Sequence, residues 1–134
     1  MRWTNGLFLG FLALVAGGCA GAGAAQGPEV TVNINHSRFA PDELRVQSGT
    51  TVRFVVHNRD PIDHEFILGN AAVQDRHENG THAEHDAVPG EISVPAGTTR
   101  STSYTFAAPG RLIIGCHLPA HYDYGMRADV IVLD

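Results

Sequence analysis

The residues with the strongest metal-binding chemistry lie close together near the C-terminus, in the stretch GCHLPAHYDYGMRADVIVLD. Cys116 is followed by His121 after four intervening residues, and Met126 comes after four more. A thiolate, an imidazole and a thioether suit copper, and electron-transfer copper sites combine a cysteine and two histidines with a long axial methionine. Pro119, Gly125 and the lack of helical periodicity place all three on a loop between strands. The pattern indicates a copper site that needs a second histidine.

His64 is the candidate for that second histidine. It begins the apolar run HEFILG, directly after the proline-containing turn sequence NRDPID. In a β-sandwich, this turn can lie at the same end as the loop that carries Cys116. We therefore expect His64 to come close to the Cys116 sulfur.

Copper is one of several chemistries that this cluster allows. Zinc bound by Cys116, His117 and His121 would lack the fourth nitrogen or sulfur ligand of a structural site and would leave Met126 without a role. A Cys–His nucleophile pair would need an activated thiolate and an orienting third group, of which the sequence gives no further sign. A c-type haem is excluded, because no second cysteine forms the attachment motif. A chance grouping of these residues around a core cysteine also stays open.

Residues 1–25 are expected to be an export signal and not part of the domain. Arg2 precedes a short apolar run from Leu7 to Val15, whereas a bilayer-spanning helix takes roughly 20 apolar residues. The sequence VAGGC resembles a lipobox, in which Cys19 would be lipidated and anchor the protein to the membrane, and ordinary cleavage near Ala25 is the alternative. Either route predicts export, to the periplasm or the outer face of the cell membrane. Cys116 would then be the one thiol of the mature domain, so no intramolecular disulfide is expected.

The composition fits a small exported protein that does not bind nucleic acid. The chain has 134 residues, which is one domain plus a short segment, and a formal net charge of −5. All nine basic residues are arginines, and they are scattered through the sequence and not clustered. We expect a monomer.

Residues 26–134 have the pattern of an all-β domain. Short runs of alternating or continuous apolar residues are separated by breakers such as PAGTT, AAPG and LPAH. Seven or eight short strands at this spacing predict a β-sandwich of antiparallel sheets. The predicted strands are EVTVNIN, ELRVQ, TTVRFVVHN, HEFILG, EISV, STSYTF, RLIIGC and ADVIVL. The residues expected to line its core include Phe39, Phe54, Phe66, Phe106 and Ile114.

Residues 70–91 interrupt this rhythm with a polar, acidic and histidine-rich segment, which we expect to be an inserted loop. Its histidines His77, His82 and His85 are interleaved with carboxylates. Together they could bind a second copper or zinc ion weakly and near the surface. The alternative is a solvated polar loop without a metal, and the sequence leaves both open.

The stretches HEFILG, PAGTT and YTFAAPGRLIIGCHLPAHYDYGM together resemble the cupredoxins, the small blue copper proteins. The Cys-x4-His-x4-Met spacing is similar to that of rusticyanin and related periplasmic cupredoxin-like proteins. The resemblance implies a cupredoxin-like Greek-key β-sandwich that binds one type 1 copper ion through His64, Cys116 and His121, with Met126 as axial ligand. His117 matches no ligand position and is expected to face outward. Glu65 departs from the residues common after the first histidine, which puts the hydrogen bonding near the thiolate in doubt.

The resemblance implies an electron carrier and not an enzyme. We expect a one-electron carrier in the cell envelope, whose redox partner protein docks near Tyr122, Asp123 and Tyr124. The alternative is a periplasmic copper-sequestering or copper-tolerance protein that uses the histidine-rich segment as an accessory metal site. Copper oxidases and nitrite reductases join several cupredoxin domains and need further histidine pairs, which disfavours an enzyme of those classes.

Overall fold

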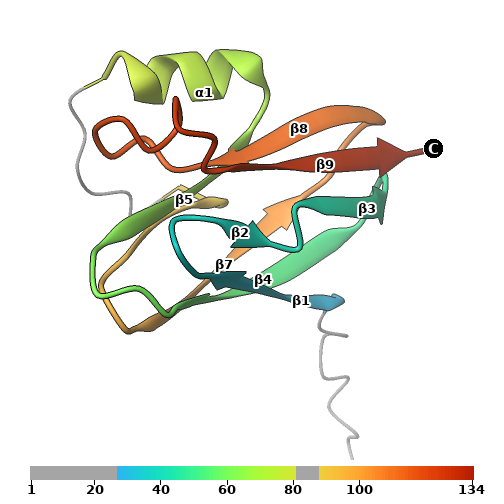
Figure 1. Cartoon of the computed structure of the whole chain (residues 1–134). Coiled ribbons are helices and arrows are strands. Elements are labelled where there is room, and N and C mark those ends of the chain that lie inside the picture. Colours follow the sequence, from blue (N-terminus) through green and yellow to red (C-terminus); the bar gives the residue numbers. More distant parts are fainter. Residues whose placement is uncertain (1–26, 81–87) are drawn as a thin grey trace, which may run out of the picture.

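The computed structural model describes residues 27–80 and 88–134. Within these ranges the chain forms two sheets packed face to face, with a single helix on the outer side of the larger sheet (Figure 1). The elements are β1 (Glu29–Ile34), β2 (Phe39–Ala40), β3 (Glu43–Gln47), β4 (Thr51–Asn58), β5 (His64–Gly69), α1 (Ala71–Glu78), β6 (Glu91–Val94), β7 (Thr99–Thr105), β8 (Gly110–Gly115) and β9 (Arg127–Leu133). The predicted all-β sandwich is confirmed.

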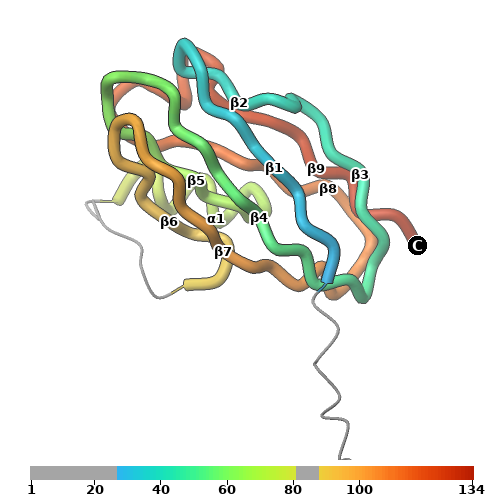
Figure 2. Tube along the Cα trace, turned by 90° about the horizontal axis from the view of Figure 1, so that it is seen from below, coloured from blue at the N-terminus to red at the C-terminus, as the bar shows by residue number. Residues whose placement is uncertain are grey.

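The strand order shows how the chain moves between the two sheets. One sheet has the order β2-β1-β4-β7 and the other the order β3-β9-β8-β5-β6. Figure 2 looks onto the four-stranded sheet, with the strands of the five-stranded sheet behind it. The prediction of purely antiparallel sheets is wrong, because β1 pairs with β4 and β3 pairs with β9 in parallel. Parallel neighbours need a crossover connection. Between β1 and β4, for example, the chain forms β3, which is a strand of the other sheet.

The predicted strands recur with small shifts at their ends. The break at Ser48-Gly49 separates β3 from β4, and Gly49 has a φ of 76°, which favours glycine. The part of the chain that the structure describes has nine strands against the seven or eight expected. The additional one is β2, a two-residue strand too short to give a periodic signal.

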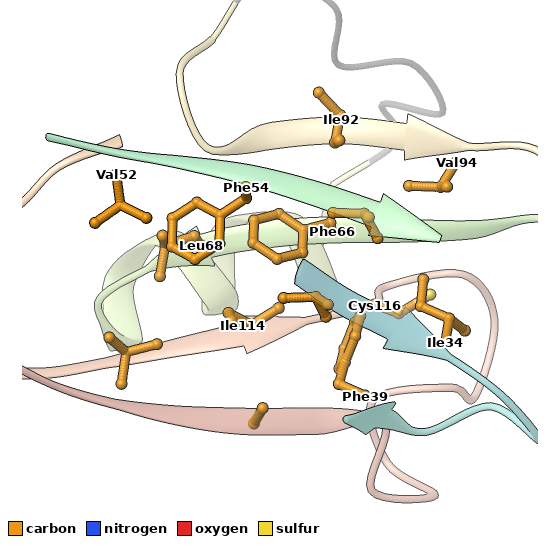
Figure 3. Close-up of a cluster of buried hydrophobic side chains, with 14 of the residues drawn as sticks. Ile34, Phe39, Val52, Phe54, Phe66, Leu68, Ile92, Val94, Ile114 and Cys116 are labelled. Atoms are coloured by element: carbon orange, nitrogen blue, oxygen red, sulfur yellow. The ribbon is translucent and has the colours of Figure 1, made fainter. Parts of the chain in front are cut away.

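The core lies between the two sheets and extends to the metal-binding end of the molecule. Buried and exposed side chains alternate along β4, as they must when one sheet face is covered. In Figure 3 the rings of Phe54 and Phe66 lie side by side, and Cys116 lies at one end of the same cluster. The five expected core residues are all buried: Phe39, Phe54, Phe66, Phe106 and Ile114.

The expectation of a loop throughout residues 70–91 is wrong, because residues 71–78 form α1. The side chain of Asn70 caps the helix by accepting a hydrogen bond from the Val73 backbone N–H at 3.1 Å. The helix lacks an apolar face and docks instead through the buried Gln74 amide, which donates to backbone carbonyls of β5 and β8. A helix that packs through polar contacts has no hydrophobic periodicity, so the sequence pattern does not predict α1. No helix within residues 27–80 and 88–134 is long and apolar enough to cross a bilayer.

Helix α1 also determines the burial of β5. This strand is buried at all six positions, because the sandwich core covers one face and α1 packs against the other. Consequently His64 and its neighbour Glu65 are both withdrawn from solvent, at 1% and 3% exposure, although they point to opposite faces of the strand.

Candidate metal centre

Three side chains from distant parts of the sequence bring their donor atoms together at one end of the sandwich. One ligand atom from each of His64, Cys116 and His121 lies within 4.8 Å of the other two. The Cys116 Sγ is 3.9 Å from His64 Nδ1 and 3.2 Å from His121 Nδ1. The cysteine and His64 are buried, whereas His121 is half-buried. The predicted approach of His64 to the Cys116 sulfur is therefore present in the structure.

The loop between β8 and β9 is held in place by its own backbone. Cys116 donates its N–H to the carbonyl of Met126 at 3.2 Å, and Met126 donates to the carbonyl of His121 at 2.9 Å. These bonds close the loop on itself, so residues separated in sequence are fixed beside one another. The Met126 side chain is 1% exposed and belongs to the same buried cluster as Cys116.

Glu65 contributes to the thiol environment through its backbone as well as its side chain. Its N–H donates to Cys116 Sγ at 3.3 Å, a bond that any non-proline residue at this position could make. Its carboxylate Oε2 accepts the N–H of His117 at 3.1 Å. The unusual side chain after His64 thus leaves a hydrogen bond to the sulfur intact and adds a link between β5 and the cysteine loop.

The nitrogen of His64 that points away from Cys116, Nε2, contacts the buried carboxylate of Asp60. His64 Nε2 lies 2.8 Å from Asp60 Oδ2. Burial by itself would raise the pKa of Asp60, but hydrogen bonds from the backbone N–H groups of Ser37 and His36, together with His64, lower the pKa overall. Asp60 is therefore ionised at neutral pH and accepts a hydrogen bond from His64.

Comparison with known proteins assigns this arrangement to a family. The model of the cupredoxin-like domain family matches residues 7–82, more than half of the chain. The chain belongs to the cupredoxin-like family. The matched region contains His64 but ends before Cys116, so the geometry of the β8–β9 loop supports the metal centre independently of that match.

Relatives of this cupredoxin include two named copper-resistant cuproprotein CopI. The protein from Rubrivivax gelatinosus is 35% identical over 83% of this chain and 69% of its own length. The protein from Pseudomonas aeruginosa is 28% identical over 83% of this chain and 80% of its own length. A solved structure of auracyanin B superposes with a TM-score of 0.68 over 83% of this chain and 92% of that one. At 24% identity, the last likeness shows the cupredoxin fold alone.

The donor set of this cupredoxin fits copper. A buried thiol with two imidazole nitrogens close to it, beside a buried methionine, is the combination that electron-transfer copper sites use. Burial raises the pKa of the Cys116 thiol to about 11, so without a metal the sulfur carries a proton at neutral pH. Burial lowers the pKa of His121, as does repulsion from His64, so its imidazole is neutral and able to coordinate.

The expectation that His117 faces outward is wrong, because only 2% of its side chain is exposed. Its Nδ1 lies 2.6 Å from Glu78 Oε2 and its Nε2 lies 2.7 Å from Gln74 Oε1, both on α1. Its ring also stacks on Tyr122 at a centroid distance of 4.6 Å. His117 therefore links the β8–β9 loop to α1. Figure 1 shows this loop running alongside the helix. The sequence gives no signal for this contact, because α1 itself was not expected.

Of the predicted accessory site, the structure describes one histidine. His77 lies on α1 with 8% of its side chain exposed, and its Nε2 is 3.1 Å from Glu91 Oε2. His82 and His85 lie outside the described residues, as do Cys19 and the rest of the predicted export signal. Within the described ranges, Cys116 is the free cysteine. The accessory site and the lipid anchor stay predictions.

Proposed function

We propose that this cupredoxin is an exported protein that binds one copper ion through His64, Cys116 and His121, with Met126 as a weak axial ligand. The observation that carries the proposal is the convergence of one thiol and two imidazole nitrogens within 4.8 Å at a buried end of the sandwich. The named copper-resistant relatives support copper as the metal.

When bound, copper supplies a one-electron couple between its cuprous and cupric states. The protein contributes a stiff ligand frame, because His64 begins a fully buried strand and the loop bearing the other ligands is closed by backbone hydrogen bonds. The Glu65 N–H is aimed at the sulfur and would stabilise the thiolate. A frame with little freedom to rearrange suits reversible electron transfer.

We further propose that the protein is a one-electron carrier in the cell envelope. The supporting observation is the half-buried His121 ring, which borders an open hollow on the surface. A redox partner protein docking at this hollow would approach the centre through one imidazole. The residues that line it are His36, Ser37, Arg38, Pro119, His121 and Tyr124.

Copper sequestration or tolerance is the second candidate function. The relatives from Rubrivivax gelatinosus and Pseudomonas aeruginosa both carry the name copper-resistant cuproprotein, and this chain covers 69% and 80% of their lengths. In this role the histidine-rich segment would act as an accessory site, whereas a carrier needs one copper only.

A copper titration of the mature domain separates the two functions. Equilibrium dialysis with metal analysis should give one tightly bound copper per chain for a simple carrier. A second equivalent that disappears in the His82→Ala/His85→Ala variant would favour copper handling. This double variant keeps His77, whose contact with Glu91 helps to seat α1, and His57→Ala on β4 is the matched control. No bound copper at all would contradict the proposed function.

Copper binding should release a proton from Cys116. The pKa of this thiol is raised to about 11 by burial, whereas the ligand must be a thiolate. Between pH 7 and 9 the apparent Kd for Cu(II), corrected for buffer competition, should therefore fall about tenfold per pH unit. Calorimetry in buffers of different ionisation enthalpy should count one proton per copper. Binding without proton release would mean that Cys116 is already ionised or is not a ligand.

A further inference from the structure

Asp60 is buried in the β4–β5 turn, whereas its neighbours in that turn are exposed. It is 6% exposed, and both of its carboxylate oxygens accept hydrogen bonds. Oδ1 accepts the N–H of His36 at 2.7 Å, and Oδ2 accepts the N–H of Ser37 at 2.8 Å. Oδ2 also contacts His64 Nε2 at 2.8 Å, so this oxygen connects the backbone of Ser37 to a ligand of the metal centre.

The backbone at His36 and Ser37, which donates hydrogen bonds to Asp60, has a conformation that binds anions. His36 and Ser37 have φ values of 51° and 52°, a left-handed conformation that is unfavourable for residues other than glycine. Two successive backbone N–H groups held in this way form a concave anion-binding nest. The Asp60 carboxylate compensates the strain, and the nest in turn prevents the carboxylate from turning away from His64.

The contact determines which nitrogen of His64 carries the proton. A carboxylate accepts hydrogen bonds, so Nε2 is the nitrogen of His64 that donates a hydrogen bond to Asp60. Nδ1 is then the nitrogen left to offer a lone pair to a metal, and it is Nδ1 that faces Cys116 Sγ. The ring is thereby fixed in both its orientation and its tautomer.

We propose that Asp60 is a positioning residue of the metal centre, which presents the Nδ1 lone pair of His64 to the metal and places a buried negative charge behind that ligand. The proposal rests on the proposed copper site. A carboxylate hydrogen-bonded to a ligating histidine increases the basicity of the ligand, and its charge favours the more highly charged metal state. Asp60 should therefore strengthen copper binding and lower the reduction potential of the centre.

Two substitutions separate the hydrogen bond from the charge. In Asp60→Asn, the amide oxygen can replace Oδ2 and keep the bonds to Ser37 and His64, while the charge and the acceptor for the His36 N–H are lost. Asp60→Ala removes both. Adding Ser37→Gly to the alanine variant lets the turn adopt positive φ without the carboxylate, so that folding is preserved. Asp63→Asn is the matched control, because Asp63 is an exposed acid in the same turn and contacts the Ala96 N–H instead.

The first measurement needs no copper. Nitrogen-15 NMR of the imidazoles in the apo protein should show His64 as the Nε2-protonated tautomer in the native protein and in Asp60→Asn. The Asp60→Ala/Ser37→Gly protein should show a tautomer mixture. A native protein with Nδ1 protonated, or an alanine variant with the native tautomer, would overturn the proposal.

The second measurement uses the copper-loaded protein. The alanine variant should bind copper about 10–100-fold more weakly, and both Asp60 variants should have a raised midpoint potential relative to Asp63→Asn. Potentials equal to that of the control would overturn the role assigned to the charge. If native protein fails to bind copper, the proposed function fails, and the NMR result still decides whether Asp60 fixes the His64 tautomer.

Discussion

Replacing Cys116 with serine should abolish the intense visible absorption that we expect Cu(II) to give in the native domain. This band arises from charge transfer between a thiolate and the metal, and Cys116 is the only sulfur among the three clustered donors. The serine hydroxyl is a harder and far less acidic donor, so tight copper binding should be lost as well. The measurement is a Cu(II) titration of the apo protein followed by visible absorption and electron paramagnetic resonance.

The serine variant should remain folded, which makes the result interpretable. Burying a hydroxyl without a hydrogen bond costs about 1–3 kcal/mol, and here the serine hydroxyl can accept the Glu65 N–H that now points at the sulfur, which offsets part of that cost. Circular dichroism of the apo variant checks this. Cys19→Ser in the full chain is the matched control and should keep the band. A Cys116→Ser protein that still turns blue would show that the thiolate–copper assignment is wrong.

Truncating Phe66 to alanine should produce the largest loss of stability among single core substitutions near the centre. Phe66 is fully buried on β5, two residues after His64, and its ring lies 5.3 Å from that of Phe54 and 6.3 Å from that of Phe39. Removing such a ring leaves a cavity and lowers the free energy of unfolding by about 3–5 kcal/mol. For a domain of this size the midpoint of thermal unfolding should fall by more than about 12 °C.

Chemical denaturation of the apo protein measures the loss without any contribution from copper. The matched control is Tyr124→Ala, since Tyr124 is 77% exposed and its replacement should change stability by less than about 0.5 kcal/mol. A Phe66→Ala loss below about 1 kcal/mol would mean that the two sheets do not pack through this ring.

Local patterns in the chain were enough to predict the fold class and to propose the ligands. The period-two runs predicted most strands, because a half-buried sheet face requires alternation. The Cys-x4-His-x4-Met spacing lies within one loop, where neighbouring residues suffice to propose a donor set. The proline-containing turn before its strand predicts that His64 lies near the cysteine, and in the structure its Nδ1 is 3.9 Å from the Cys116 sulfur.

The surroundings of those ligands depend on how distant segments pack. The burial of His117 depends on α1, which docks by polar contacts that leave no hydrophobic pattern in the sequence. The parallel pairing of β1 with β4 depends on a crossover through the other sheet. The nest at His36 and Ser37 closes around Asp60 only when residues more than twenty positions apart meet. The spacing of residues along the chain shows which side chains can donate to a metal. The hydrogen-bond partners of those side chains depend on how segments distant in sequence pack together, which the sequence pattern does not reveal.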